Sequence, residues 1–266
     1  MRIVKDQAEA SILEFTDKEV KSATRVHSFR KRCKKIRGFL LLIRPAIGEC
    51  FALANQPIKD AGRALSQARD FAIVEELTAS MGTHHRESFG ISEHLAEFCE
   101  KRVKYFIALM NTWPKSISPE QVAQGYEITY RRFRKAYEHA KERETIKTLH
   151  TVRKWAKYHW YQTRILEKID RPVLRQHREL MREIGDCLGQ AHDAAMALRQ
   201  TGEGSKASKF RGQLERSMIE KIQKAKVCLV EATRQKPSYY ATRIESALMV
   251  SQLQYRHNGA RGKTIS

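Results

Sequence analysis

The stretch HSFRKRCKKIR, residues 27–37, places six Lys or Arg side chains and one histidine within eleven positions. Its pattern returns as HTVRKWAKYHW, residues 150–160, and the two stretches lie 123 positions apart. A second pair of segments, ALSQARDFAIV (64–74) and CLGQAHDAAMA (187–197), is separated by the same offset without a gap. One offset shared by two independent segments indicates a duplicated unit, which is too long to be a solenoid repeat. We therefore predict two related helical domains.

The composition is that of a folded protein that attracts polyanions. The 266 residues are 41% apolar, and the formal net charge is +20. This length accommodates one large domain or two modest ones, and the apolar fraction is sufficient for a core. A strongly positive surface attracts nucleic acid, anionic membranes and polyphosphate, so these three are the candidate partners.

The cysteines and the first residues indicate an intracellular protein. The five cysteines are scattered and show no CxxC spacing, so we expect reduced thiols and no zinc site. The opening MRIVKDQAEASILEF lacks the features of a signal peptide, and no run of 18 apolar residues occurs. We expect a soluble, cytoplasmic protein without membrane association, metal or cofactor.

Apolar spacing and helix breakers predict four helices in each copy. The leading helices span about 3–15 and about 119–140, and the basic helices about 17–44 and about 143–169. Third helices follow at about 46–81 and about 173–199, fourth helices at about 90–112 and about 207–235, and a further helix at about 238–256. Pro45 and Pro172 are expected to end the basic helices.

The predicted fold class is all-α, because no alternating strand pattern of useful length occurs. The repeat is satisfied by two pseudo-symmetric antiparallel four-helix bundles. We place the first bundle at residues 1–118, the second helical bundle at 119–256 and a flexible tail at 257–266. The stretch MNTWPKSISPE (110–120), with its prolines and polar turn formers, joins the two.

The first basic helix is two-faced. At 100° per residue, His27 and four cations (Arg30, Lys31, Lys34 and Arg37) occupy an arc of about 120°. Phe29, Cys33 and Ile36 occupy the opposite side. Few acidic side chains stand four positions away, so the cations repel one another and an anionic ligand would relieve the repulsion. The candidate ligands to a polyanion on this helix are His27, Arg30, Lys31, Lys34, Lys35 and Arg37.

The second basic helix repeats this arrangement, and the third helices supply a facing wall. On an ideal helix, two cations in each third helix share the face of Asp70 or Asp193. We expect the cationic faces to form the walls of a groove in each copy, with the two grooves meeting or lining up across the pseudo-two-fold axis. The two aspartates are expected to orient neighbouring Arg or His side chains. The candidate residues are His150, Arg153, Lys154, Lys157, Tyr161 and Arg164 on the basic helix, and Lys59, Arg63, Arg175 and Arg182 on the third helices.

A basic helix face that is merely solvated is the alternative to a binding site. The repeat weighs against it, because His, Arg and Lys recur at equal offsets while Gly38 and Tyr161 diverge. His27 and His150 each precede Arg at i+3 and Lys at i+4, which excludes a local pair of metal ligands. We interpret them as phosphate donors whose pKa is lowered by nearby cations and restored by a bound polyanion.

These motif segments, in this order, resemble the CHAD family, the conserved histidine α-helical domain. The resemblance spans roughly residues 3–256 and rests on the two basic stretches and on the segments Ala68-Arg69-Asp70, Leu188-Gly189 and His192-Asp193. It implies two pseudo-symmetric four-helix bundles around a basic groove or channel that binds inorganic polyphosphate, with no catalysis attributed to the domain.

The family's basic positions fall on residues of both copies, with two departures. Trp160 stands where an arginine is usual before Tyr161, and Arg164 stands where an acid often follows it. The second groove therefore departs from the family pattern at these two positions, and Arg164 adds positive charge. The positions carried over are His27, Arg30, Lys34, Lys35, Arg37, His150, Arg153 and Lys157.

Nucleic acid is the alternative polyanion, since Lys and Arg bind any phosphate backbone by charge. Proteins that bind single strands interleave aromatic side chains with cations, and the first basic stretch has none on its cationic face. An enzyme is not expected, because ERETIK (142–147) is out of register for ExExK. The tail segment GARGKT (259–264) is preceded by His257 at the position where a phosphate loop needs glycine. Chain-length preference, oligomeric state, protein partners and cellular role, including recruitment to polyphosphate granules, stay open.

Overall fold

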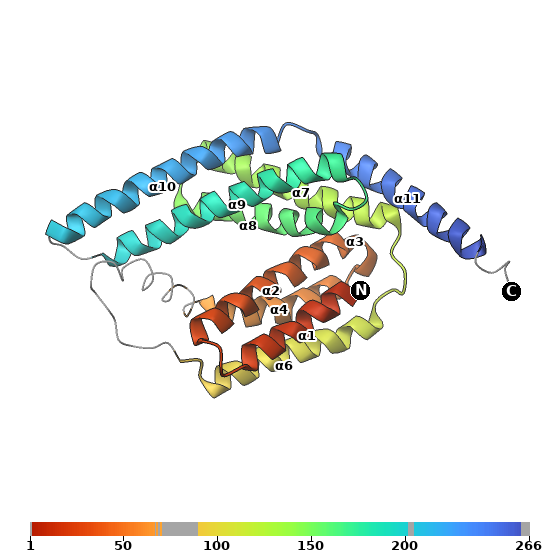
Figure 1. Cartoon of the computed structure of the whole chain (residues 1–266), viewed down its shortest axis with the longest axis horizontal. Coiled ribbons are helices and arrows are strands. Elements are labelled where there is room, and N and C mark those ends of the chain that lie inside the picture. Colours follow the sequence, from red (N-terminus) through yellow and green to blue (C-terminus); the bar gives the residue numbers. More distant parts are fainter. Residues whose placement is uncertain (1, 67, 69, 71–89, 202–204, 262–266) are drawn as a thin grey trace.

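The computed structural model of the chain describes residues 2–66, 68, 70, 90–201 and 205–261, without the side chains of residues 200, 205–207 and 254–261. Every regular element in these ranges is a helix, which confirms the all-α prediction (Figure 1). The elements are α1 (Arg2–Thr16), α2 (Ser22–Leu42), α3 (Arg44–Ile47), α4 (Cys50–Ala64), α6 (Glu93–Leu109), the 3-10 turn η2 (Met110–Thr112), α7 (Pro119–Glu142), α8 (Ile146–Leu166), α9 (Arg171–Gln200), α10 (Ser205–Ala232) and α11 (Pro237–Arg261).

Side-chain caps set several of the helix starts. Ser118 and Thr145 each accept a hydrogen bond from the backbone N–H three residues ahead and complete a capping box, at the starts of α7 and α8. Ser92 caps α6 by accepting from the N–H of Leu95. Pro172 lies in the first turn of α9, where its missing N–H leaves no bond unmade.

Three boundaries differ from those predicted. The helix expected from residue 46 breaks at Gly48, whose φ of 50° lies in the left-handed region that glycine enters easily, so α3 and α4 are separate. The basic helix α2 begins at Ser22, because residues 18–20 form a turn and a bend. The last helix continues to Arg261 and so enters the segment predicted as a tail. Residues 71–81, expected to be helical, lie outside the described residues.

The helices enclose two main apolar cores. One is built by α1, α2, α4 and α6, and contains the paired rings of Phe15 and Phe29, whose centroids are 4.6 Å apart. The other is built by α7–α11 around Tyr126, Tyr130 and Phe133, which are fully buried. Figure 1 shows α1, α2, α4 and α6 lying together on one side of the molecule and α7–α10 on the other.

The two sets of helices meet where α2 contacts α7 and α8. An ideal Cβ on Gly125 of α7 would lie 1.8 Å from the carbonyl oxygen of Leu42, so only glycine allows this approach. The buried amide of Gln162, on α8, donates to the carbonyl of Gly38 on α2 at 2.9 Å. These contacts bring the two basic helices, α2 and α8, directly against each other.

A buried polar chain ties α11 to α8 and α9. The Nε2 atoms of His159 and His177 are 3.1 Å apart, and Nδ1 of His177 is 3.0 Å from the hydroxyl of Tyr240. Both histidines are almost completely buried, at 0% and 2% exposure. Burial lowers the pKa of His159 far below its ordinary value and that of His177 to about 3, so both rings are neutral in the fold.

We predict that Gly125→Ala destabilises the protein, because its methyl group would overlap the Leu42 carbonyl and push α7 from α2. The expected loss is about 1–3 kcal/mol or more in the free energy of unfolding, measured by urea denaturation. Gly212→Ala in α10 is the matched control, since its Cβ meets nothing within 4 Å. It should leave stability unchanged or raise it by up to about 1 kcal/mol. Equal stability of the two variants would contradict the close α2–α7 contact.

We also predict that acid destabilises the fold through His177. The unfolded chain binds a proton below about pH 6.5 while the folded ring stays neutral, so stability is present above that pH and falls as the pH drops. By pH 5 this one group should lower the free energy of unfolding by about 2 kcal/mol. His177→Gln should flatten the pH dependence between pH 7.5 and 5, whereas His94→Gln, at an exposed position of α6, should not. The same slope in wild type and His177→Gln would rule the mechanism out.

Candidate functional site

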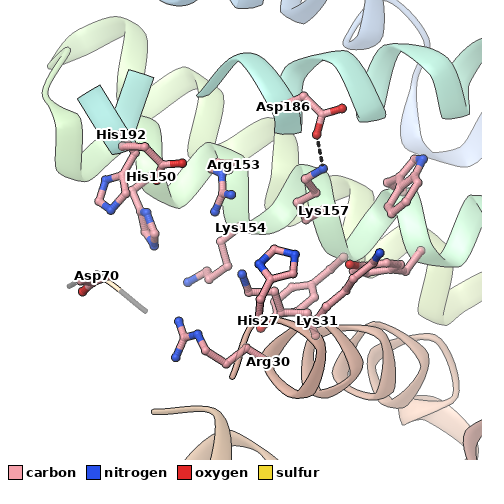
Figure 2. Close-up of a pocket in the computed structure, with 15 residues that line it drawn as sticks. His27, Arg30, Lys31, Asp70, His150, Arg153, Lys154, Lys157, Asp186 and His192 are labelled. Carbon is pink, nitrogen blue, oxygen red and sulfur yellow. Dashed lines mark hydrogen bonds and ion pairs between the residues drawn. The ribbon is translucent and has the colours of Figure 1, made fainter. Parts of the chain in front are cut away.

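A cavity of about 440 Å³ lies where α2, α8 and α9 converge (Figure 2). Among the described residues, its lining combines six Lys or Arg, three His, three Asp and three aromatic side chains. They are Arg30, Lys31, Lys34, Arg153, Lys154 and Lys157; His27, His150 and His192; Asp70, Asp186 and Asp193; and Tyr158, Trp160 and Tyr161.

The first basic helix contributes four side chains over about two turns. His27, Arg30, Lys31 and Lys34 stand at i, i+3, i+4 and i+7, the spacing that aligns side chains on one helix face. Phe29 on the opposite face is fully buried in the first core. Burial of that face therefore fixes the rotation of α2 and turns the four basic residues toward the cavity.

The second basic helix repeats the arrangement. His150, Arg153, Lys154 and Lys157 of α8 line the same cavity, with Tyr161 one turn further. Figure 2 shows these side chains and those of α2 converging from two helices on the same space. The two cationic faces predicted from the repeat thus meet in one cavity.

Backbone carbonyls hold an arginine of each basic helix at equivalent positions. Nη1 of Arg30 donates to the carbonyl of Gly62 on α4, and it also lies 3.1 Å from the hydroxyl of Ser66. Nε of Arg153 donates to the carbonyl of Gly185 on α9 at 3.3 Å. Arginine and acceptor are separated by 32 residues in both cases. These bonds orient the guanidinium groups through partners that carry no charge.

Two glycines of α9 let the α8 side chains lie flat against that helix. An ideal Cβ on Gly185 would come within 2.6 Å of Cε of Lys157, and one on Gly189 within 2.9 Å of Nε of Arg153. Residues four apart share a helix face, so Gly185 and Gly189 open one shallow groove. Each glycine inside a helix costs about 1 kcal/mol relative to alanine. The shape of the groove therefore depends on keeping both positions without side chains.

Positive charge exceeds negative charge in the cavity. Its six described Lys and Arg side chains face three aspartates, and Lys157 donates to Oδ1 of Asp186 at 2.7 Å (Figure 2). The pKa of Lys154 is lowered by partial burial and by the nearby Arg37 and Arg132. Cations held together in this way are stabilised by a bound anion.

Two imidazole rings lie together at one end of the cavity. The ring centroids of His150 and His192 are 4.7 Å apart, and Figure 2 shows them near Asp70. Partial burial lowers the pKa of His150 to about 4, with further contributions from His192 and Arg153. Burial also lowers the pKa of His192, against the opposing effect of Asp193. Nδ1 of His192 is buried without a hydrogen-bond partner among the described atoms.

Seven predicted binding residues do not line the cavity. Lys35 donates to Gln7 at 3.2 Å, on the side of α2 that faces α1. Arg164 lies over the ring of Trp160, 5.7 Å from its centroid, at the cavity edge. The seven are Lys35, Arg37, Lys59, Arg63, Arg164, Arg175 and Arg182.

The azimuth of a side chain on a helix does not give its position along the axis. Arg175 and Asp193 share an azimuth, but 18 residues separate them by about 27 Å at about 1.5 Å per residue. Arg175 and Arg182 line a different hollow of about 520 Å³, where Arg182 pairs with Glu179 at 2.9 Å. Sharing a face with Asp193 therefore does not place them with the basic helices.

Four lining residues were absent from the predicted set: Tyr158, Trp160, Asp186 and His192. Asp186 stands seven residues before Asp193, a spacing that returns to the same helix face, so that rule could have found it. It also occupies the position equivalent to Arg63 at the 123-residue offset. In the sequence, Trp160 stands out only as a departure from the family pattern. Its position in the cavity lining depends on how α8 packs against α2.

No helix among the described residues combines the length and the apolar character that crossing a bilayer requires. Nor do three or more His, Cys, Asp or Glu side chains in this part of the chain form a group that could hold a metal ion.

We predict that His150 titrates well below a solvated histidine, with a pKa of about 4 measured by NMR. Lys34→Gln should raise that pKa, because one neighbouring positive charge is removed. Lys209→Gln, an exposed change on α10, should leave it in place. A pKa for His150 near its ordinary value of about 6.5 would contradict the electrostatics of the cavity.

Comparison with known proteins supplies one match. A profile of the CHAD domain matches residues 10–200, which include nearly all of α1 through α9. Neither the curated proteins nor the solved structures contain a match to this chain. Both α10 and α11 lie entirely beyond the matched range, although both helices contribute to the second core. Since the match covers well over half of the sequence and includes both basic stretches, the chain belongs to the CHAD domain family.

Proposed function

We propose that the cavity between α2, α8 and α9 binds inorganic polyphosphate. The observation that carries this proposal is the convergence of two cationic helix faces on a cavity with a net positive charge. Guanidinium groups match phosphate oxygens geometrically, and lysine ammonium groups contribute as compact charges. Membership of the CHAD family supports the same ligand class.

Orientation of the donors in advance favours binding of a flexible polymer. Carbonyls of α4 and α9 hold Arg30 and Arg153, so these side chains lose little freedom when phosphate binds. Binding of the anion would also reverse the lowered pKa of His150, which adds a positive charge to the cavity. The ligand would therefore bind with proton uptake and release of its counterions.

We further propose that the two halves arose by duplication and form two pseudo-symmetric bundles. Two equivalent bonds support this, one from Arg30 to Gly62 and one from Arg153 to Gly185. The two arginines are 123 positions apart, and so are the two glycines. The separate cores of the two sets of helices are consistent with it. A duplicated cationic site suits a polymer whose charged groups repeat along its length.

Nucleic acid is the second candidate, because three aromatic side chains line the cavity. Stacking requires an accessible ring face. Tyr158 and Tyr161 are only 4% and 8% exposed. Trp160 is flanked by Lys157, 5.1 Å from its centroid, and by Arg164. This geometry favours a polyanion without bases.

The proposed role is binding without catalysis. The groups that recur between the halves are mainly donors and cations, and Asp186 is engaged by Lys157. Through such binding, a cytoplasmic protein of this kind would collect on polyphosphate granules. Its oligomeric state and protein partners do not enter the proposal.

We predict that Arg30→Gln, Lys34→Gln, Arg153→Gln and Lys157→Gln together weaken polyphosphate binding by at least about 100-fold at 0.1 M salt. The slope of log affinity against log salt should fall by about 3, because about 0.7 is lost per phosphate contact. Calorimetry or anisotropy measures both quantities, and circular dichroism should show unchanged helicity.

The matched control carries the same change in charge at exposed positions outside the cavity: Lys18→Gln, Arg175→Gln, Arg182→Gln and Lys209→Gln. An equal loss of affinity in the control would mean that binding is a property of net charge alone. In a competition assay on the wild-type protein, polyphosphate should displace a labelled probe at lower concentration than single-stranded DNA of equal charge does. Equal displacement would favour the nucleic-acid alternative.

A further inference from the structure

A row of four cations leads out of the cavity over the surface of α8, α2, α7 and α3. It begins at Lys154, which lines the cavity, and we call it the Arg132 row. Partial burial and then Arg37 and Arg132 lower the pKa of Lys154. Partial burial and then Arg44 lower the pKa of Arg132. The members are Lys154, Arg37, Arg132 and Arg44. Lys154 is near enough to Arg37 and Arg132 to be repelled by both, and Arg132 is near enough to Arg44.

Aromatic rings position these side chains. The guanidinium of Arg132 and the ammonium of Lys154 each lie 5.1 Å from the ring centroid of Trp155. The guanidinium of Arg37 lies 5.3 Å from the centroid of Tyr158, and that of Arg44 lies 4.9 Å from the centroid of Phe51. Cation–π contacts orient a cation without neutralising it.

Carboxylates do not compensate this row in the part of the chain that the structure describes. None of its four members forms an ion pair within 4.0 Å there, whereas the neighbouring Arg131 pairs with Glu127 at 2.6 Å. Nε of Arg37 instead donates to the side-chain oxygen of Asn55 at 3.0 Å, which is a neutral partner. The positive charge of the row therefore stays available to a ligand.

In the opposite direction out of the cavity, the positive charge is partly compensated. Lys31 is followed along α2 by Arg32 and Lys35, and Arg32 forms a salt bridge with Glu14. The pKa of Glu14 is lowered by Arg32, and the charges of Lys35 and Lys31 lower it further. An acidic side chain thus offsets the cations on that side, and the Arg132 row is the better path for an anion.

The cavity holds only a short piece of a polymer. Its volume of about 440 Å³ corresponds to roughly 15 water molecules at about 30 Å³ each, which is room for a few phosphate units. We propose that a longer polyphosphate chain leaves the cavity at Lys154 and continues along Arg37, Arg132 and Arg44. The inference rests on the proposed function and adds a second binding segment, which makes affinity increase with chain length.

The test compares two probes, tripolyphosphate and a polyphosphate of about 100 units, on the full chain with Arg44→Gln and Arg132→Gln. The long probe should bind at least about 10-fold more weakly than to the wild type, and its salt slope should fall by about 1.4 for two lost contacts. Tripolyphosphate affinity should change by less than about 2-fold, because the cavity keeps its own cations.

The matched control is Arg131→Gln with Arg182→Gln, which removes two charges that are already paired with Glu127 and Glu179. It should weaken binding of the long probe by less than about 3-fold. Circular dichroism on both variants checks that the fold is kept. An unchanged affinity of Arg44→Gln/Arg132→Gln for the long probe, or a loss equal to that of the control, would overturn the proposal. So would an equal loss for both probes.

A third variant, Arg30→Gln with Arg153→Gln, separates this inference from the proposed function. If it loses tripolyphosphate binding while Arg44→Gln/Arg132→Gln binds the long probe normally, the cavity proposal stands and the extension fails. If it binds both probes as the wild type does, the cavity proposal fails and the extension fails with it.

Discussion

The site depends on the direct packing of α2 against α8, two helices that both carry dense positive charge. Gly38 eases the approach, because an ideal Cβ built on it would make a tight contact of 3.2 Å with Cβ of Tyr161. The buried bond from Gln162 to the Gly38 carbonyl then holds the two helices together. Apolar faces on the far sides of both helices are anchored in separate cores, so neither helix can rotate its cations away. Repulsion is therefore built into the fold. Partial burial is the larger cause of the lowered pKa of His150 and of Lys154, and the neighbouring charges add to it.

The third helix of each copy, α4 or α9, holds the mutually repelling side chains in fixed positions around the cavity. Carbonyls of α4 and α9 accept from Arg30 and Arg153, and the glycines of α9 leave room for Arg153 and Lys157 to lie along its surface. A neutral acceptor fixes a guanidinium group while its charge persists, whereas a carboxylate would fix it and also compensate it. Around Trp155 and Phe51, aromatic rings play the same part for Arg132 and Arg44. Among the described residues, the members of the Arg132 row are thus positioned without an ion pair, whereas the cavity also contains the pair of Lys157 and Asp186.

Much of this arrangement could be predicted from the sequence, because it follows from periodicity. The spacing of Phe29 against Arg30 and Lys34 gives the two faces of α2, and the 123-residue offset carries the same faces to α8. What periodicity leaves out is position along a helix axis, which explains why Arg175 lies in a different hollow. It also leaves out contacts between the two sets of helices, on which the roles of Trp160 and Arg132 depend. The break at Gly48 is visible only in the backbone conformation and not in the sequence, since glycine is compatible with both a continuing and a broken helix.

The most direct test of the central claim follows the arginine Nε–H signals by NMR while tripolyphosphate is added at physiological salt. We expect the signals of Arg30 and Arg153 to shift together with one dissociation constant, because both guanidinium groups line the same cavity. Arg175 and Arg182, which line another hollow, should stay in place. Shifts confined to Arg175 and Arg182, with Arg30 and Arg153 unmoved at saturation, would contradict the account.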